Sequence, residues 1–384
     1  MSKIWIIAGE ASGDAYGAEL ARQLRIQEPG ADLRGMGSSL MRQAGVELFT
    51  DSTELGVVGF WEVLKSVAFF YRLLKETVQR AEQERPDVVV LIDYPGFNLR
   101  LAQRLHKLGI RVVWYISPQV WAWKKGRIPK LAACVDRMLC IFPFEPAVYD
   151  GSGLDVRFVG HPLLEILAPW KQRNSIRDEK QVVLLPGSRS SEIQRMLPTF
   201  LLSAAQMHAQ RPDLHFVMPL ARQSSLNQVK EMIPGLNLPT EFLEALEITV
   251  GDARDKMVTS IAGLAASGTV TVEATLLGLP VVVAYRLNWL TWQIASLLIK
   301  IPHVSIANLV TNRTIFEEFL QYRAIPENLV PATLALLPGG ARRQEVLEGM
   351  RDCENALQGG QGGAGQGGVS KEVARQVLEV ARKP

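Results

Sequence analysis

The sequence predicts an α/β protein in which helices cover parallel sheets. Short apolar runs rich in β-branched residues recur along the chain, and glycine and then apolar residues at helical spacing follow them. Such alternation is typical of parallel sheets covered by helices. The predicted strands are Ile4–Ala8, Val88–Ile92, Val112–Ile116, Val182–Leu185, Phe216–Pro219, Leu264–Ala266 and Val281–Ala284.

The chain is long enough for two domains, because its 384 residues are more than twice the roughly 150 of a typical domain. Residues 166–180 interrupt the apolar pattern with charges, a proline and an asparagine, so we place the interdomain linker there. The predicted division is an N-terminal domain at 1–168, a second domain at 176–340 and a helical C-terminal segment at 341–384.

The C-terminal segment contains a low-complexity stretch from Gly359 to Gly368, which predicts a flexible loop because glycine has the greatest backbone freedom. The helix predicted after it, Lys371 to Arg382, has apolar residues at helical spacing. This spacing predicts that the helix docks on the folded protein.

Composition excludes several classes of protein. A net charge of +3 gives no general electrostatic attraction to nucleic acid. The three cysteines form no CxxC pair and have no histidine at ligand spacing, so we expect neither disulfides nor a structural zinc, and a cytoplasmic location. The apolar run at the N-terminus is too short for a signal peptide, and no run reaches the 18 or so residues that span a bilayer. Any membrane association is therefore expected to be peripheral.

The first loop that could carry chemistry is Gly9 to Asp14, directly after the first strand. Ligands of open α/β sheets bind at this end of the strands. The glycines at 9, 13 and 17 match neither a dinucleotide fingerprint nor a P-loop. The alternative interpretation is a bare turn and helix cap.

Two further loops follow strands in the same half. Asp93 comes directly after Ile92 and could act as a general base, although an Asp before Pro-Gly also commonly caps a turn. The segment from Ser117 to Trp123 pairs two tryptophans with polar residues, which suits the wall of a sugar or acyl site. A buried aromatic pair is the alternative.

The second half presents two loops suited to phosphate. Arg189 follows Leu185-Pro186-Gly187-Ser188 and could neutralise a phosphate beside the amides of the next helix; the alternative is a surface arginine after a turn. Gly268 and Thr269 open another predicted helix, and Glu273 could accept hydrogen bonds from ribose hydroxyls. This half has no DxD pair, so we expect a nucleotide-sugar site without metal or other cofactor.

Seven ordered segments together resemble the lipid-A-disaccharide synthase family. They are GEASGD at 9–14, IDYPGFN at 92–98, SPQVWAWK at 117–124, FPFE at 142–145, GHP at 160–162, LLPGSR at 184–189 and ASGT at 266–269. The resemblance implies the GT-B fold, with two Rossmann-like domains whose parallel sheets face a central cleft. It also implies that the first domain takes the acceptor and faces the membrane, while the second binds a UDP-sugar.

The resemblance further implies an inverting, metal-independent transfer. A 2,3-diacylglucosamine unit would leave UDP and join the 6-hydroxyl of 2,3-diacylglucosamine 1-phosphate through a β-1,6 bond, giving lipid A disaccharide 1-phosphate. Two other classes stay open: another nucleotide-sugar enzyme, such as an epimerase or a transferase with a different lipid acceptor, and a non-catalytic UDP-sugar-binding membrane protein.

An inverting displacement needs a base for the acceptor hydroxyl and positive charge or amides for the departing UDP. The predicted catalytic residues are Asp93, Glu10, Ser12 and Asp14. The predicted substrate- and nucleotide-binding residues are Gly13, Gln119, Trp121, Gly187, Ser188, Arg189, Glu192, Ser267, Gly268, Thr269, Glu273, Tyr285 and Asn308. Asn308 rests on the resemblance. For His161, contact with a substrate and capping of a turn stay open.

Residues 60–80 predict a helix at the inner-membrane surface. One face, formed by Phe60, Leu64, Val67, Tyr71, Leu74 and Val78, is ordinary core. Val63, Phe69, Phe70 and Leu73 lie outside that face among basic residues, a pattern typical of an interfacial helix. A helix buried between domains is the alternative. A second apolar segment, 289–300, could contribute, and the family resemblance suggests a homodimer.

Overall fold

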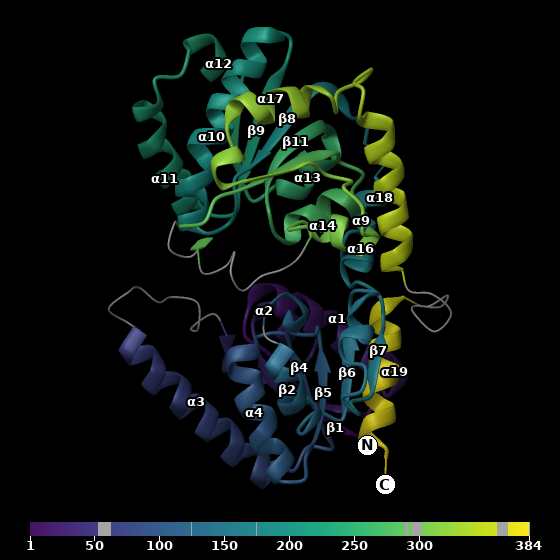
Figure 1. Ribbon diagram of the computed structural model, residues 1–384. Coiled ribbons are helices and arrows are strands. Elements are labelled where there is room, and N and C mark those ends of the chain that lie inside the picture. The colour runs from purple at the N-terminus through teal and green to yellow at the C-terminus, as the bar shows by residue number, and fades with distance from the viewer. Residues whose placement is uncertain are drawn as a thin grey trace. The chain divides into compact units, whose positions relative to one another are not determined.

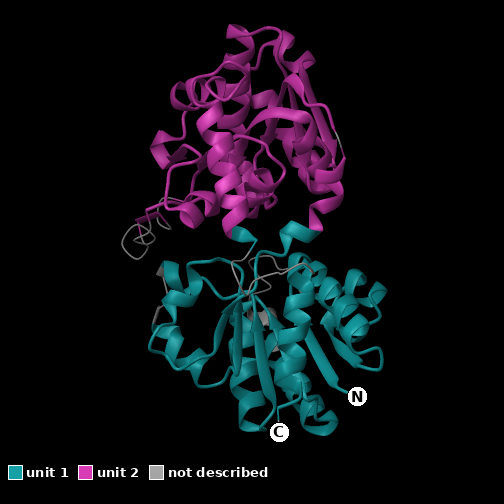
Figure 2. Ribbon diagram, turned by 90° about the vertical axis from the view of Figure 1, so that its right-hand side faces the viewer, with its two compact units in different colours: residues 1–165, 357–384 teal, residues 166–356 magenta. Residues whose placement is uncertain are grey.

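We analysed a computed structural model of the chain (Figure 1). It describes residues 1–52, 63–123, 125–173, 175–288, 292–293, 302–358 and 368–383. The side chains of residues 63–68, 123 and 125 are outside this description, as are the predicted membrane segment's residues 60–62, almost all of the apolar segment 289–300, and most of the glycine-rich loop. The chain divides into two compact units, residues 1–165 with 357–384 and residues 166–356 (Figure 2).

Unit 1 contains a parallel sheet whose described strands run in the order β3-β2-β1-β4-β5-β6-β7. The strands are β1 (Lys3–Ala8), β2 (Asp32–Gly37), β3 (Glu47–Asp51), β4 (Val88–Ile92), β5 (Arg111–Tyr115), β6 (Arg137–Cys140) and β7 (Val156–Phe158). Its helices are α1 (Ala11–Gln27), α2 (Ser39–Gln43), α3 (Val63–Glu84), α4 (Pro95–Lys107), α5 (Val120–Trp123), α6 (Ile128–Ala132), α7 (Glu145–Val148), α8 (Leu163–Ile166) and α19 (Val369–Ala381), with a 3-10 turn at Lys125–Arg127.

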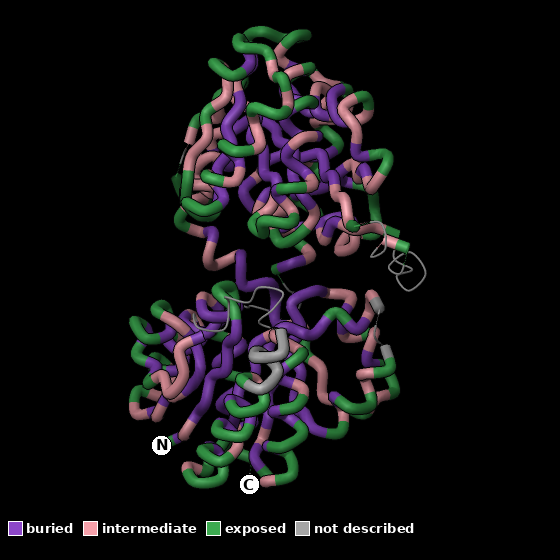
Figure 3. The backbone as a smooth tube through the Cα atoms, turned by 90° about the vertical axis from the view of Figure 1, so that its left-hand side faces the viewer, coloured by how far each residue is buried: buried purple, intermediate pink, exposed green. Residues whose placement is uncertain are grey.

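The core of unit 1 forms around the central strands, which are apolar on both faces because helices cover both. Every residue of β4 is buried. Trp5 on β1 and Trp114 on β5 are both fully buried. In the tube view the buried stretches run through the interior of the unit and the exposed ones lie outside (Figure 3).

Unit 2 repeats the design with strands in the order β10-β9-β8-β11-β12-β13. They are β8 (Asp178–Leu185), β9 (His215–Leu220), β10 (Leu246–Val250), β11 (Ser260–Ala266), β12 (Val281–Tyr285) and β13 (Glu318–Leu320). The helices are α9 (Ala168–Gln172), α10 (Ser190–Gln210), α11 (Gln223–Met232), α12 (Thr240–Glu244), α13 (Ala253–Thr259), α14 (Thr269–Leu276), α16 (Ile306–Thr311), α17 (Pro326–Leu334) and α18 (Arg343–Leu357), with 3-10 turns at Ile233–Leu236 and Gln321–Arg323.

The predicted fold class is confirmed. All described strand pairs are parallel, and each of the seven predicted strands coincides with an observed one. The strands that the sequence pattern did not predict are β2, β3, β6, β7, β10 and β13. All six lie at or next to a sheet edge, and in five of them, β2, β3, β7, β10 and β13, the pattern of buried residues is less continuous.

The predicted C-terminal helix forms and docks. It is α19, which belongs to unit 1 and packs against α1 and against β4 and β5, while α18 belongs to unit 2 (Figure 1). Arg137, which is 6% exposed, donates hydrogen bonds to Gln376 and Glu379 of α19. Glu165 accepts hydrogen bonds from Ser370 at the start of the helix.

The predicted apolar faces of α3 need one correction. Tyr71, which we placed on the core face, is 63% exposed, whereas Leu73, placed outside it, is 5% exposed. The buried face instead contains Leu73, Leu74, Thr77 and Ala81. The buried residues of α3 are therefore close in sequence to those that helical spacing selected. Phe69 is 38% exposed and remains outside the buried face, as predicted. No helix in the described part of the chain is long and apolar enough to cross a membrane.

Candidate active site

The register of the unit 1 sheet brings three predicted loops to one edge. Ala8 at the end of β1 lies opposite Ile92 of β4, and Ile92 lies opposite Tyr115 of β5. The loops that begin at Gly9, Asp93 and Ile116 therefore leave the sheet side by side. The carboxyl ends of parallel strands are the usual ligand edge of such a sheet.

The loop after β1 supplies one exposed and one buried carboxylate. Glu10 and Ser12 are exposed, and Gly13 is buried, where a β-carbon would lie 3.3 Å from Ala8 and 3.6 Å from Ile92. Asp14 is 3% exposed, and its carboxylate accepts hydrogen bonds from the backbone N–H groups of Ser38 (2.6 Å), Leu40 (3.0 Å) and Met41 (3.2 Å). The side chain of Asp14 thus fastens the start of α2 to α1.

Asp93 lies at the end of β4 in a strained and poorly solvated position. Its φ is +45° and that of Tyr94 is +46°, a backbone region that few residues other than glycine adopt. The pKa of Asp93 is raised to about 6, chiefly by burial and in addition by the negative charge of Glu10, while a hydrogen bond from the Tyr94 N–H opposes both. Such a carboxyl can take up a proton near neutral pH, as a general base must.

The Tyr94 ring ties the first two loops together. A β-carbon at position 9 would lie 2.5 Å from this ring, so Gly9 is the residue that lets the two loops approach. The ring centroid of Tyr94 is 6.3 Å from that of Phe70 on α3 and 6.2 Å from that of Phe97 on α4. An aromatic path thus connects the Asp93 loop to α3.

The loop after β5 packs on the FPFE segment. Gln119 is exposed, while Ser117 is 4% exposed and shares a 2.8 Å hydrogen bond with the Tyr149 hydroxyl. The ring of Trp121 meets that of Phe144 edge-on at 5.3 Å. The Glu145 carboxylate accepts hydrogen bonds from the N–H groups of Ile141 and Phe142, and burial raises its pKa to about 7.

His161 caps a turn, which is one of the two alternatives that the sequence left open. It is 2% exposed, its Nδ1 accepts a hydrogen bond from the Leu163 N–H at 3.2 Å, and burial lowers its pKa to about 3. The ring is therefore neutral at physiological pH and packs against Phe142.

In unit 2 the register again brings predicted loops together. Leu185 of β8 lies opposite Ala265 of β11, and Ala266 lies opposite Ala284 of β12. The loops that begin at Pro186 and Ser267 therefore leave neighbouring strands at the same edge, with Tyr285 at the end of the third strand.

The loop after β8 is shaped by Glu192 and presents Arg189. Glu192 accepts hydrogen bonds from the N–H groups of Ser188 (3.1 Å) and Arg189 (3.3 Å), and it pairs with the Arg189 guanidinium at 3.0 Å. Gly187 has a φ of +114°, and a β-carbon there would lie 2.7 Å from the Glu192 side chain. Glu192 holds the loop, while the Arg189 side chain stays 74% exposed and able to reach an anion.

The loop after β11 leads into α14 with Gly268 as its N-cap, where the first backbone N–H groups of the helix have no intrahelical acceptor. Thr269 is exposed, and Ser267 donates to the Val304 carbonyl at 3.3 Å. Glu273, one turn into the helix, receives hydrogen bonds on its Oε1 from both Nε (3.0 Å) and Nη2 (2.7 Å) of Arg254. The guanidinium of Arg254 in turn lies 5.1 Å from the centre of the Trp170 ring.

Asn308 and Tyr285 differ in how available they are. Asn308 is fully buried, and its amide is occupied by Phe316 and Glu318, so it fastens α16 to β13. Tyr285 is half-buried; burial raises its pKa, and the charges of Glu192 and Arg189 also act on it. Tyr285 therefore belongs to the same cluster as the loop after β8.

Several residues of these sites were not predicted. Arg254 follows β10 and Gly251, but the sequence pattern did not predict that strand, so Arg254 was not marked as the partner of Glu273. Asn98 and Glu145 stand inside the segments IDYPGFN and FPFE, and that membership was the signal available for them. The described residues contain no group of three or more His, Cys, Asp or Glu side chains that could hold a metal ion.

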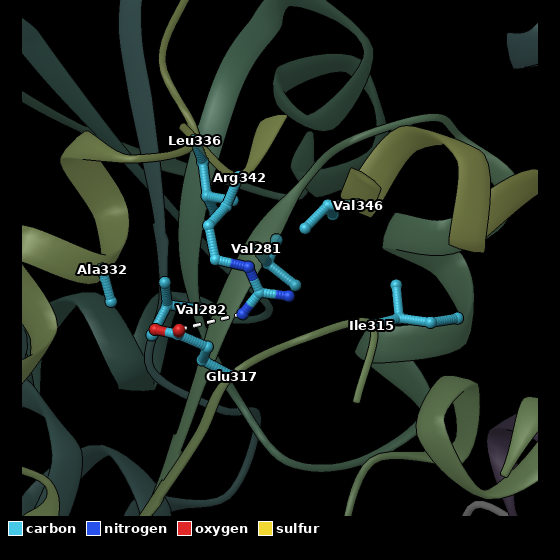
Figure 4. Close-up of a pocket in the computed structure, with 8 residues that line it drawn as sticks. All are labelled: Val281, Val282, Ile315, Glu317, Ala332, Leu336, Arg342 and Val346. Atoms are coloured by element: carbon cyan, nitrogen blue, oxygen red, sulfur yellow. Dashed lines mark hydrogen bonds and ion pairs between the residues drawn. The ribbon is translucent and has the colours of Figure 1, made fainter. Parts of the chain in front are cut away.

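A small pocket in unit 2 is separate from these loops (Figure 4). It is lined by Val281, Val282, Ile315, Glu317, Ala332, Leu336, Arg342 and Val346. Val281 and Val282 begin β12, whereas the candidate site lies where the strands end. Glu317 and Arg342 form an ion pair of 2.9 Å across it, which already satisfies its charged groups.

Comparison with known proteins identifies the family. The family model described as lipid-A-disaccharide synthetase matches residues 4–363. The chain belongs to this family. A lipid-A-disaccharide synthase of Myxococcus xanthus (strain DK1622) is 36% identical over 98% of this chain and 97% of its own length, and one of Nitrosococcus oceani is 38% identical over 97% and 96%.

Solved structures support the fold alone, because their sequences are distant. UDP-GlcNAc 2-epimerase from Neisseria meningitidis bound to UDP-GlcNAc aligns with a TM-score of 0.67 at 13% identity, covering 98% of this chain and all of that one. The glycotransferase of kitacinnamycin aligns with a TM-score of 0.64 at 15% identity, covering 98% of each chain. The predicted GT-B class is confirmed, and so is the prediction of an enzyme, a glycosyltransferase of lipid A biosynthesis.

Proposed function

We propose that this lipid-A-disaccharide synthase family member joins UDP-2,3-diacylglucosamine to 2,3-diacylglucosamine 1-phosphate. The transfer inverts the donor carbon, forms a β-1,6 bond and releases UDP. Family membership supports a UDP-sugar donor and a lipid-linked acceptor. The observation that carries the mechanism is Asp93, whose pKa of about 6 leaves it ionised, yet basic, at neutral pH.

In the proposed reaction the 6-hydroxyl of the acceptor attacks C1 of the donor sugar. The bond from C1 to the UDP oxygen breaks as the new glycosidic bond forms, and the hydroxyl proton passes to the carboxylate of Asp93. Glu10 and Ser12, exposed on the neighbouring loop, bind the reacting sugars. Asp14 and Gly13 keep that loop in place, and Gln119 with Trp121 forms a wall of the acceptor side.

The departing UDP is held by unit 2. Arg189, with the N–H groups of Gly187, Gly268 and Thr269, would neutralise the diphosphate as charge develops on it. Glu273 accepts the ribose hydroxyls through Oε2, because Arg254 occupies Oε1. Four further residues support the loops of this site: Glu192, Ser267, Tyr285 and Asn308. We propose no metal in the transfer.

We also propose that the protein binds the cytoplasmic surface of the inner membrane through α3. Phe69 and Tyr71 are exposed there beside the exposed basic residues Arg72, Lys75 and Arg80. The aromatic path from Phe70 to Tyr94 leads from this helix to the Asp93 loop and suits an acyl chain. The homodimer suggested by the family resemblance is part of the same proposal.

UDP release by the purified protein tests the reaction. The donor is supplied with and without the acceptor, in detergent containing EDTA. Release that depends on the acceptor supports a metal-independent transfer; release without acceptor would mean hydrolysis. The pH profile of kcat/KM adds a second test, because activity should fall as the pH drops through about 6 and Asp93 becomes protonated.

A further inference from the structure

Two neighbouring strands of unit 1 end in backbone that their residues rarely adopt. Asp93 and Tyr94 after β4 have φ values of +45° and +46°, and Ile116 after β5 has a φ of +70°. The left-handed region is unfavourable for L residues, and especially so for a β-branched residue such as isoleucine. Strain of this kind persists only where the surrounding structure holds it in place.

Asn98 on α4 holds the end of β4. It is fully buried, and its Nδ2 donates hydrogen bonds to the carbonyl oxygens of Asp93 (2.8 Å) and Ile92 (3.2 Å). Its Oδ1 has no hydrogen-bond partner in the described part of the chain. Burying an amide oxygen without a hydrogen-bond partner is unfavourable, and an apolar residue would avoid this cost. We therefore attribute the presence of Asn98 to the two hydrogen bonds that its Nδ2 donates.

Trp114 holds the end of β5 in the same way. It is fully buried on β5, and its Nε1 donates a 3.0 Å hydrogen bond to the carbonyl of Ile116. Strands β4 and β5 lie side by side in the sheet (Figure 1), with Ile92 opposite Tyr115. One buried side-chain N–H donor therefore stands behind each of the two strained strand ends.

We infer that Asn98 and Trp114 are positioning residues for the transfer, because their buried N–H groups fix the left-handed strand ends that present Asp93 and the Ser117–Trp121 loop. The inference rests on the proposed function, since it concerns the same base and the same acceptor wall. Neither residue contacts the substrates; each acts through the backbone carbonyl that it holds.

A matched pair of tryptophans provides the first test. Trp114→Phe removes the N–H and keeps an aromatic ring. Trp5→Phe makes the same change at another fully buried tryptophan in the same sheet, whose Nε1 has no hydrogen-bond partner among the described residues. Trp114→Phe should lower kcat on the order of tenfold with an unchanged KM for the donor, and Trp5→Phe should leave kcat close to wild type. Equal kcat values for the two variants would overturn the inference for Trp114.

Asn98→Ala provides the second test, with Ser203→Ala as its control. Ser203 on α10 is fully buried and donates one hydrogen bond of 2.7 Å to the Thr199 carbonyl, so its loss also removes a buried donor. Both variants should unfold at a lower temperature. Only Asn98→Ala should lower kcat, by about a hundredfold, because small displacements of a catalytic group have effects of that size.

The pH profile separates positioning from general destabilisation. If Asn98→Ala lets the Asp93 carboxyl turn toward water, the acid limb of kcat/KM should move to lower pH, since burial is the main cause of the raised pKa. A lower Tm with wild-type kcat and an unmoved acid limb would overturn the inference for Asn98. Should Asn98→Ala fail to fold, the tryptophan pair still decides whether buried donors at these strand ends matter.

Failure of this inference is distinguishable from failure of the proposed function. Asp93→Asn that keeps its turnover would remove Asp93 as the base, and the proposed mechanism with it. Asp93→Asn that loses turnover, together with Trp114→Phe and Asn98→Ala that behave as their controls, would leave the mechanism in place and remove only the positioning roles.

Discussion

The strand ends of the two units are built from the same topology and yet differ in their chemistry. In unit 1 the described residues give Asp93 no cationic partner, its pKa is raised by burial, and its backbone is left-handed. In unit 2 the carboxylates of Glu192 and Glu273 are paired with Arg189 and Arg254, and glycine takes the left-handed position after β8. These environments suit the proposed roles, a proton acceptor in unit 1 and an anion site in unit 2.

Proton transfer and anion binding place different requirements on the backbone. An anion site can use backbone N–H groups, so glycine serves well at its turns because it has no side chain to strain. A base must present a side chain at a fixed place, so unit 1 keeps Asp93, Tyr94 and Ile116 in conformations that glycine would adopt more easily.

The largest expected effect concerns the base. Asp93→Asn preserves the shape of the side chain but cannot accept the hydroxyl proton. We expect turnover to fall roughly 100- to 10,000-fold, the range typical of general-base catalysis. Acceptor-dependent UDP release measures it, with Asp14→Asn compared alongside, since Asp14 bonds the backbone of α2. A turnover within a few fold of wild type would place the base elsewhere.

The next effect concerns the anion site of unit 2. Arg189→Ala should weaken donor binding about 10- to 150-fold, because one charge-assisted hydrogen bond contributes about 1.5 to 3 kcal/mol. The change should be seen in the KM for the donor. Arg211→Ala, at the C-cap of α10 and so at the opposite end of the helix that Arg189 begins, is the control for loss of an arginine. An unchanged KM would show that Arg189 is a surface residue, the alternative that the sequence left open.

A smaller effect on nucleotide binding is expected from substitution of Arg254, whose guanidinium pairs with the Glu273 carboxylate. Without Arg254 the Glu273 side chain loses both hydrogen bonds on Oε1 and should no longer be held toward the ribose. Arg254→Ala should reduce the preference for UDP over 2′-deoxy-UDP about tenfold, whereas Arg254→Lys should retain part of it. Competition binding of the two nucleotides gives the ratio, and an unchanged ratio would remove Glu273 from the ribose site.

Substitutions on the exposed face of α3 should cause a moderate loss of membrane binding. Phe70 packs against the core and Tyr94, so the exposed pair Phe69 and Tyr71 is the better target. Phe69→Ser with Tyr71→Ser should lower recovery with anionic liposomes several-fold, since exposed apolar area sets such binding. Leu243→Ser with Tyr322→Ser, two residues of unit 2 that are 38% and 81% exposed, is the matched control. Equal recovery of both variants would exclude α3 as the membrane contact.

The smallest effect is a gain in stability. The pKa of Asp93 is about 6 in the folded chain and near 3.8 without its surroundings, so the folded state favours the protonated form. Stability from this group is present at low pH and is lost as the pH rises through about 6. Asp93→Asn should therefore raise Tm at pH 8 by a few degrees relative to wild type, and by less at pH 5. An equal change at both pH values would contradict the raised pKa.

Much of the fold could be predicted because the central strands are buried on both faces and therefore read as continuous apolar runs. β4 is the clearest example, since all five of its residues are buried. Strands such as β7 and β10 escaped prediction because little of either strand is buried, so their sequences alternate or lack an apolar run. Tyr71 was wrongly assigned to the buried face. Helical spacing shows which residues share a face, but it locates the centre of that face only to within about a residue.

The location of the candidate site could be predicted because the ends of the strands could be predicted. Parallel strands bring their following loops to one edge, so Glu10, Asp93 and Gln119 could be grouped before their contacts were known. The role of each side chain in these loops could not be predicted from its place in the sequence. Asp14 and Glu192 stand in the predicted loops but bond backbone N–H groups, and Arg254 reaches Glu273 from a helix without a recognisable motif.

In the proposed function unit 1 carries the base and unit 2 carries the nucleotide, and UDP binding separates these two roles. Titration calorimetry would give the Kd for UDP of the wild-type protein, Asp93→Asn and Arg189→Ala. Asp93→Asn is expected to bind UDP like the wild type although it has lost turnover, whereas Arg189→Ala is expected to bind UDP about 10- to 150-fold more weakly. Weakened UDP binding by Asp93→Asn together with wild-type binding by Arg189→Ala would contradict the division of roles between the two units.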